Sequence, residues 1–142
     1  MPQEVTITRT AITTVEDAAK KNTEMGRKHI VPYALYRAEG YISANLARKV
    51  TGFNEEDLAL LWKSIFNMFE LDRSAARGNM AMRELIVFRH ESELGNAPAY
   101  RLFERVKVQK KTGEQPARQY ADYDVSVNTE GLPSGVTCER IS

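Results

Sequence analysis

An α+β fold, with helices packed on one face of a sheet, is what this sequence predicts. Three observations lead to it. Short segments rich in Val, Ile, Thr and Tyr lie near both ends of the chain and suit strands. One central segment repeats its apolar residues at helical spacing. The expected order is strand, strand, helix, strand, helix, strand, which favours helices segregated to one face, as in RNA-recognition-motif and ferredoxin-like folds.

The first third of the chain predicts two strands around a polar loop. Residues 5–12 alternate and are rich in Thr and Ile, which indicates a strand. Residues 13–28 are polar and charged, so we expect a loop with at most a helical turn. Residues 30–43 are apolar and aromatic and predict a second strand. Pro32 interrupts it, because proline cannot donate a hydrogen bond to a ladder.

Two helices are expected next. Ser43 caps a short helix that ends at Gly52. Asn54 caps a long helix whose first turn is acidic, which suits the positive end of a helix. The apolar stripe of the long helix comprises Leu58, Leu61, Trp62, Ile65 and Phe69, broadened by Leu60, Phe66 and Met68. So broad a stripe predicts a helix that is covered on more than one side.

The last third predicts a strand, a helix and a final strand. Residues 85–88 are a short apolar run between charges, typical of a central strand. Pro98 suits the first turn of a helix that reaches about residue 108. A polar linker follows, residues 123–127 alternate as a strand does, and we expect residues 131–142 to form a loose tail.

The composition predicts one globular domain over residues 1–142. The chain is 42% hydrophobic and 27% charged, and no apolar run approaches the length of a membrane span. Cys138 is the only cysteine, which excludes a disulfide within the chain and a cysteine zinc cluster. We expect no cofactor, no metal and no membrane partner, and a cytoplasmic location.

Charge alone does not identify a nucleic-acid partner, because the net charge is only +1. Residues 1–53 nevertheless carry eight Lys and Arg against five acidic residues, which allows a local basic surface. RNA-binding sheets need cations for phosphates and exposed aromatic rings for stacking. The cation candidates are Lys20, Lys21, Arg27, Lys28 and His29, with Met25 as an apolar wedge between bases. The stacking candidates are Tyr33, Tyr36 and Tyr41, two of which we expect to face the core. On composition alone, a solvated loop is the simpler interpretation of the cations.

Catalytic chemistry finds little support in the residues. His90 has no second histidine at metal-ligand spacing. Cys138 near the chain end is interpreted as an inert thiol, and Asp72 beside Arg73 as a local salt bridge or a helix-end contact. We therefore expect no catalytic residues.

Several segments resemble a known family. They read DRSAARG at 72–78, LGNAPA at 94–99, MGRKHIVPYALYRAEGYISANLA at 25–47, TGFNEEDLALLW at 51–62 and NAPAYRLFERVKV at 96–108. They are similar to the repeated backbone subunit of the CRISPR Cascade complex, subtype I-C (Cas-seven family, Csd type). The similarity runs from about residue 5 to residue 127.

The resemblance implies a non-catalytic subunit for antiviral defence. Several copies would lie along the CRISPR RNA and hold its backbone, while the guide pairs with target DNA. Other copies of the subunit and other Cascade subunits would be its protein partners. A projecting hairpin, the thumb, would reach the neighbouring copy, and we place it at residues 13–28. Arg73 and Arg77 are further candidates for contact with RNA or a neighbour, and the alternative is that they fix the turn after the long helix.

The chain differs from the family in one respect: it resembles only the C-terminal half of the family's members. We therefore expect an incomplete RNA-recognition sheet. Two alternatives follow. One is a metal-dependent endoribonuclease with Asp17 in the thumb loop. The other is a docking piece that binds Cascade subunits without RNA. The residues leave open the number of copies per complex and which tyrosines face RNA.

Overall fold

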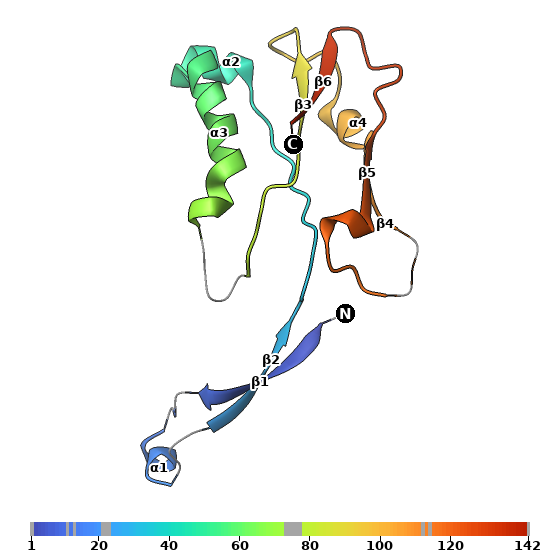
Figure 1. Ribbon diagram of the computed structural model, residues 1–142. Coiled ribbons are helices and arrows are strands. Elements are labelled where there is room, and N and C mark those ends of the chain that lie inside the picture. The colour runs from blue at the N-terminus through green and yellow to red at the C-terminus, as the bar shows by residue number, and fades with distance from the viewer. Residues whose placement is uncertain are drawn as a thin grey trace. The chain divides into compact units, whose positions relative to one another are not determined.

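The chain mixes helices with small antiparallel sheets, which confirms the predicted α+β class (Figure 1). The structure is a computed structural model. It describes residues 2–10, 12, 14–20, 24–72, 78–111, 113 and 115–141, without the side chains of 8–10 and 24. Their strands form three two-stranded sheets, β1–β2, β3–β6 and β4–β5. The RNA-recognition arrangement of the sheet stays a prediction.

The chain divides into two compact units. Unit 1 comprises Met1–Tyr36 and Lys110–Asp124, and unit 2 comprises Arg37–Gln109 and Val125–Ser142. The organisation of residues 1–142 as one domain stays a prediction. None of the described helices is long and apolar enough to span a membrane.

Unit 1 contains an antiparallel hairpin of β1 (Gln3–Thr10) and β2 (Glu24–Ile30), with the short helix α1 (Val15–Ala18) between them in sequence (Figure 1). Gln3 is paired with Ile30, and the register shifts between Ile7 and Thr10. This corrects two predictions. The C-terminal part of the predicted 13–28 loop is strand, and the predicted 30–43 strand is absent.

The reason for both corrections lies in the pairing. Residues 24–30 carry many charges, yet a ribbon with solvent on both faces accepts charged side chains at every position. Past Ile30, Pro32 lacks the N–H that a continuing ladder needs. The strand therefore lies before the proline and not across it.

The tyrosine prediction fails for the same reason. Tyr36 is 77% exposed and Tyr41 is 74% exposed, so two of the three tyrosines face solvent and only Tyr33 is half-buried. The ring of Tyr33 lies 6.3 Å from that of Tyr123 in unit 1. Strand alternation does not apply to residues 31–43, because they form no strand.

The helices of unit 2 begin where their caps predict. The Ser43 hydroxyl caps α2 (Ala44–Leu46), which continues into the π-helical turn η1 (Ala47–Thr51) and ends at Gly52 with φ +71°. Asn54 begins α3 (Glu55–Leu71) through a reciprocal capping box with Asp57. Both caps are confirmed.

The covering of α3 was predicted wrongly. Its five stripe residues are half-buried, but Leu60 is 63% exposed and Met68 is 45% exposed. At 3.6 residues per helical turn, these two side chains project away from the stripe and are exposed to solvent. Apolar character in the sequence does not by itself supply a second packing partner.

The C-terminal tail is a strand and not a loose segment. β6 (Val136–Ile141) pairs antiparallel with β3 (Leu85–His90), with Leu85 opposite Ile141 and His90 opposite Val136. β3 is therefore a strand as predicted, but its sheet has only two described strands. Val136 is buried and Cys138 is half-buried, so the tail carries a short alternating pattern that the composition concealed.

The predicted 98–108 helix is shorter than expected. α4 (Ala99–Phe103) is followed by β4 (Val106–Lys110), which pairs with β5 (Tyr123–Val127). The 3₁₀ turn η2 (Tyr120–Asp122) precedes β5, whose alternating burial confirms the last predicted strand. The sequence Val-Lys-Val-Gln-Lys alternates and suits a strand better than a helix once a partner is present.

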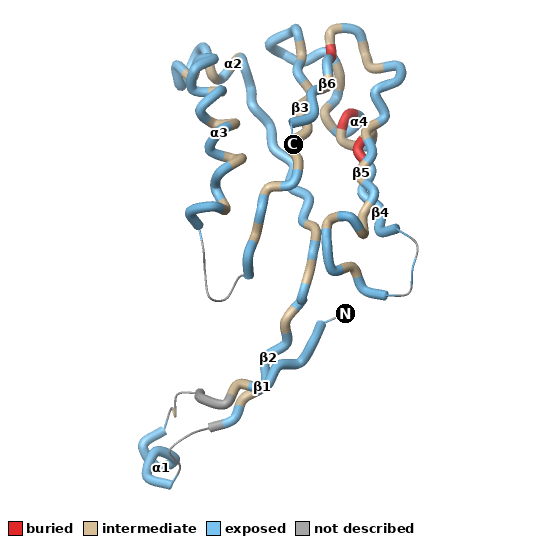
Figure 2. The backbone as a smooth tube through the Cα atoms, in the orientation of Figure 1, coloured by how far each residue is buried: buried red, intermediate tan, exposed pale blue. Residues whose placement is uncertain are grey.

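Buried hydrophobic side chains are few and gather in unit 2. Among the described residues they are Leu102 at 1%, Val106 at 9% and Val136 at 7% exposed (Figure 2). Two arginines tie the surrounding loops together. Arg37 donates to the carbonyls of Phe103 and Val106 at 2.8 and 2.9 Å, and Arg105 donates to three carbonyls between residues 128 and 131.

Candidate nucleic-acid interface

One face of the β1–β2 hairpin gathers cationic, apolar and acidic side chains. Side chains two residues apart on a strand share a face, as do residues directly opposite each other. Glu4 lies opposite His29, and Thr6 lies opposite Arg27. Met25 precedes Arg27 by two positions. We call these five residues the Glu4 face.

The Glu4 carboxylate lies between the two basic side chains. Its Oε1 is 3.5 Å from Arg27 Nε, and its Oε2 is 3.7 Å from His29 Nε2. The side chains of Arg27, His29 and Glu4 are 76%, 67% and 46% exposed. Ion pairs this exposed contribute little stability, because water screens them. The cations therefore remain accessible to another anion.

Met25 adds an apolar group to the same face and is 75% exposed. The exposed Met25 side chain therefore contributes little to packing within the protein. It is available to insert between unstacked bases, as apolar wedges do in nucleic-acid complexes. The Glu4 face can thus contact both a phosphate backbone and a base step.

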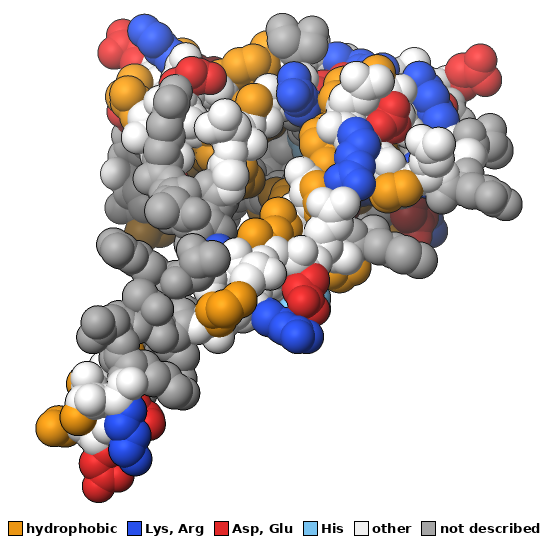
Figure 3. All heavy atoms as spheres, turned by 60° about the horizontal axis from the view of Figure 1, so that its bottom comes forward, with side chains coloured by type: hydrophobic (Ala, Val, Ile, Leu, Met, Phe, Trp, Pro, Cys, Tyr) orange, Lys and Arg blue, Asp and Glu red, His pale blue; other side chains and the backbone are white. Residues whose placement is uncertain are grey.

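The other predicted cations do not join the Glu4 face. Lys28 is exposed but alternates onto the opposite face of the hairpin, beside its strand partner Val5. Lys20 is exposed in the turn after α1. Lys21, Arg73 and Arg77 lie outside the described residues. Figure 3 shows cationic, acidic and hydrophobic side chains close together on the part of the chain that holds α1, so no continuous basic surface covers it in that view.

Sequence reasoning missed part of this face. It proposed His29 among the loop cations but gave no role to Glu4 or Thr6. The missing signal was the register, because only pairing with β1 brings Glu4 between Arg27 and His29. The spacing of Arg27 and His29 could have indicated a shared face, had residues 24–30 been interpreted as a strand.

Five described arginines of unit 2 have partners within that unit. Besides Arg37 and Arg105, which donate to carbonyls, three arginines pair with carboxylates. These pairs are Arg48–Glu93, Arg89–Glu55 and Arg140–Glu84. The side chains of Arg48 and Arg89 are 70% and 60% exposed, which is comparable with Arg27, so the Glu4 face is distinguished by an exposed methionine on the same face as its basic side chains.

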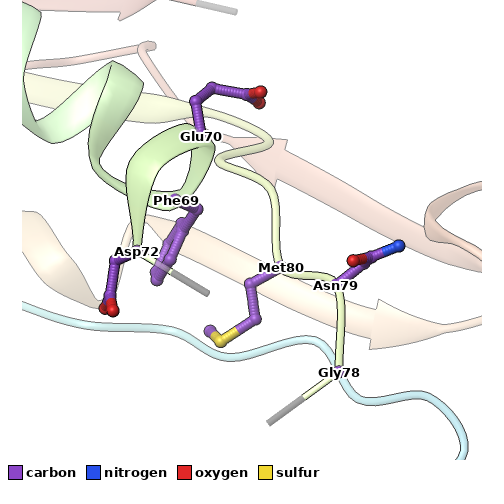
Figure 4. Close-up of a pocket in the computed structure, with 6 residues that line it drawn as sticks. All are labelled: Phe69, Glu70, Asp72, Gly78, Asn79 and Met80. Carbon is purple, nitrogen blue, oxygen red and sulfur yellow. The ribbon is translucent and has the colours of Figure 1, made fainter. Parts of the chain in front are cut away.

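Two cavities are lined by described residues of unit 2. One, of about 200 Å³, lies where α3 ends and is lined by Phe69, Glu70, Asp72, Gly78, Asn79 and Met80. Figure 4 shows Phe69 and Met80 on adjoining segments, with Glu70 directed away from both. Its two carboxylates disfavour a phosphate ligand. The other is an apolar groove of about 400 Å³ with Tyr41 on its wall.

Groups that could do chemistry are engaged in local structure. The Asp17 carboxylate accepts the Thr14 hydroxyl at 2.6 Å in the first turn of α1. His90 Nδ1 accepts the Asn96 N–H at 2.9 Å. Burial raises the pKa of the Cys138 thiol, which favours the unreactive protonated form. The described residues contain no group of three or more His, Cys, Asp or Glu side chains suited to a metal.

The comparisons with known proteins identify the family. A search of curated proteins found no match to this chain. The family model described as CRISPR-associated protein Cas7 matches residues 1–128, which include the hairpin, α3 and the β4–β5 sheet. The match spans most of the chain, and the protein therefore belongs to the Cas7 family of CRISPR Cascade backbone subunits.

Proposed function

We propose that this protein is a non-catalytic, guide-RNA-binding backbone subunit of a type I-C Cascade complex. The β1–β2 hairpin is its thumb. The observation that carries the proposal is the Glu4 face, where an exposed methionine shares one face of the hairpin with two exposed basic side chains. Membership of the Cas7 family gives that face an RNA as its expected ligand.

The Glu4 face suits RNA binding without sequence preference. Arg27 neutralises a phosphate charge and His29 offers a ring nitrogen to the same backbone, and a phosphate contact carries no base information. Met25 wedges between neighbouring bases and interrupts their stacking. Lys20, beyond α1, adds a further phosphate contact toward the hairpin end. Sequence recognition of target DNA is then left to base pairing with the guide.

The protein partners follow from family membership. We propose that other copies of this subunit and other Cascade subunits flank it along the CRISPR RNA. Subtype I-C rests on the sequence similarity over residues 25–47 and 94–108. Exposed Tyr36 and Tyr41 are candidates for stacking on RNA bases.

The test is binding of the full chain to a CRISPR RNA by fluorescence anisotropy at two salt concentrations. Replacing Arg27 with Ala removes one exposed, charge-assisted phosphate contact of about 1 kcal/mol, which corresponds to roughly a fivefold loss of affinity. The dependence of log affinity on log salt should become shallower by about one.

Lys63→Ala is the matched control, because Lys63 is an exposed cation on α3 in unit 2. Equal losses for both variants would assign the effect to net charge and contradict the hairpin as the RNA site. No binding by the native chain at low salt would contradict RNA binding by this chain. Co-purification with Cascade subunits would then favour the docking alternative.

The non-catalytic role is tested at Asp17. We expect no RNA cleavage by the native chain in the presence of Mg²⁺ or Mn²⁺, because the Asp17 carboxylate is engaged by Thr14 at the start of α1. Metal-dependent cleavage that is lost in Asp17→Ala would make the endoribonuclease alternative the correct one.

A further inference from the structure

We propose that Glu4 is a built-in competitor for the RNA phosphate, which restrains the affinity of the Glu4 face. This inference rests on the proposed RNA-binding function and adds a regulator to the same site. Removal of the Glu4 charge should strengthen RNA binding, even though the residue lies within the proposed contact surface.

The position of Glu4 is the first argument. Its two carboxylate oxygens lie 3.5 and 3.7 Å from the two basic groups of the face, one oxygen for each group. The register places Glu4 directly opposite His29. Thr6, which is opposite Arg27, is the next residue after Glu4 on the same face of β1. One carboxylate thus serves both basic side chains that a phosphate would use.

The chemistry of the ligands is the second argument. A carboxylate and a phosphate accept hydrogen bonds from the same guanidinium and imidazole N–H donors with similar geometry. A phosphate that approaches Arg27 or His29 must displace Glu4 or share the donors with it. A shared arrangement places two negative charges a few ångströms apart, which is unfavourable even in water.

Exposure is the third argument. All three side chains remain substantially exposed, so the internal pairs are weak and displacement is feasible. Glu4 therefore weakens the anion site without closing it. A buried pair in the same place would have blocked the face instead.

The experiment compares Glu4→Gln with Glu16→Gln in the anisotropy assay with CRISPR RNA. Both changes remove one negative charge from unit 1, but Glu16 is an exposed residue of α1 and takes no part in the β1–β2 pairing. We expect Glu4→Gln to raise affinity by roughly threefold at low salt, against little change for Glu16→Gln. The gain should shrink at high salt, because screening weakens the repulsion.

A double-mutant cycle shows whether Glu4 acts through its partners. The gain from Glu4→Gln should be smaller when Arg27 and His29 are both replaced by Ala, since no donors are left to compete for. Glu4→Ala is a second variant with the same expected direction. Circular dichroism of each variant shows whether the β1–β2 hairpin and the rest of the chain keep their folded signal.

The outcomes separate this inference from the proposed function. Equal affinities for the two glutamine variants, with Arg27→Ala still weakening binding, would overturn the role of Glu4 and leave RNA binding intact. Weaker binding by a folded Glu4→Gln would also overturn it. Binding by Glu4→Gln where the native chain does not bind would support it. Absence of binding by every variant would overturn both proposals.

Discussion

The hairpin of unit 1 and the β3–β6 and α4 region of unit 2 contain similar apolar residues but bury them very differently. In unit 2, Leu102, Val106 and Val136 are buried. In the described part of the hairpin every side chain is exposed or half-buried, and Val5 and Met25 are 42% and 75% exposed. Unit 2 thus holds the core, whereas the hairpin presents a surface.

This difference indicates how the two regions are stabilised. An isolated two-stranded hairpin is marginally stable in water, because it buries too little apolar area. The β1–β2 hairpin therefore gains little stability from apolar burial of its own. The β3–β6 ladder also has two strands, but its last residue pair includes the buried Val136.

The largest expected effect comes from removing the most buried side chain. Leu102→Ala should lower the free energy of unfolding by about 2–5 kcal/mol, because it removes buried methyl groups and leaves a cavity. Urea denaturation followed by circular dichroism measures the change.

Val5→Ala on the hairpin is the matched comparison and should change the same free energy by less than about 1 kcal/mol, because Val5 is far more exposed. Similar losses from the two variants would mean that the hairpin contributes to a shared core, and the contrast between the regions would be wrong.

A smaller effect is expected at Gly135, which precedes β6 with φ +78°. A Cβ there would lie 2.9 Å from Asn96 Cγ and 3.1 Å from Glu91 Oε2, in a backbone conformation that strains any other residue. Gly135→Ala should cost about 1–3 kcal/mol of unfolding free energy. Gly40→Ala, with open space around the new Cβ, is the control and should cost little. Equal thermal shifts would show that the turn before β6 tolerates a side chain and that β6 docks loosely.

The smallest effect is expected in the loop that follows β3, where Asn96 lies next to Gly135. His90 Nδ1 accepts the Asn96 N–H at 2.9 Å, and the Asn96 carboxamide oxygen accepts the Ser92 N–H at 2.9 Å. His90→Ala removes that acceptor and should cost about 1 kcal/mol. His90→Asn retains an acceptor near the Nδ1 position and should recover most of the loss. Hydrogen exchange of the Asn96 amide reports the bond directly, and equal protection in both variants would contradict its role.

The site was less predictable than the helices. The side chains of Ser43 and Asn54 accept hydrogen bonds from backbone N–H groups no more than three residues away. The sequence was therefore sufficient to predict where both helices begin. Arg27 is exposed, as expected for a cation in a polar segment, and its contact with RNA stays a prediction. Its neighbour Glu4 was not predictable, because more than twenty residues separate them along the chain.

The sequence by itself determined the α+β class, both capped helices and the alternating strand β5, since each depends on contacts between residues a few positions apart. Only the tertiary structure decided that the chain end is β6, that α4 stops before β4, and that Glu4 meets Arg27 and His29. The physical reason is that strand pairing joins residues distant in sequence. A short polar segment becomes a strand when a partner supplies the hydrogen bonds, and its composition does not name that partner.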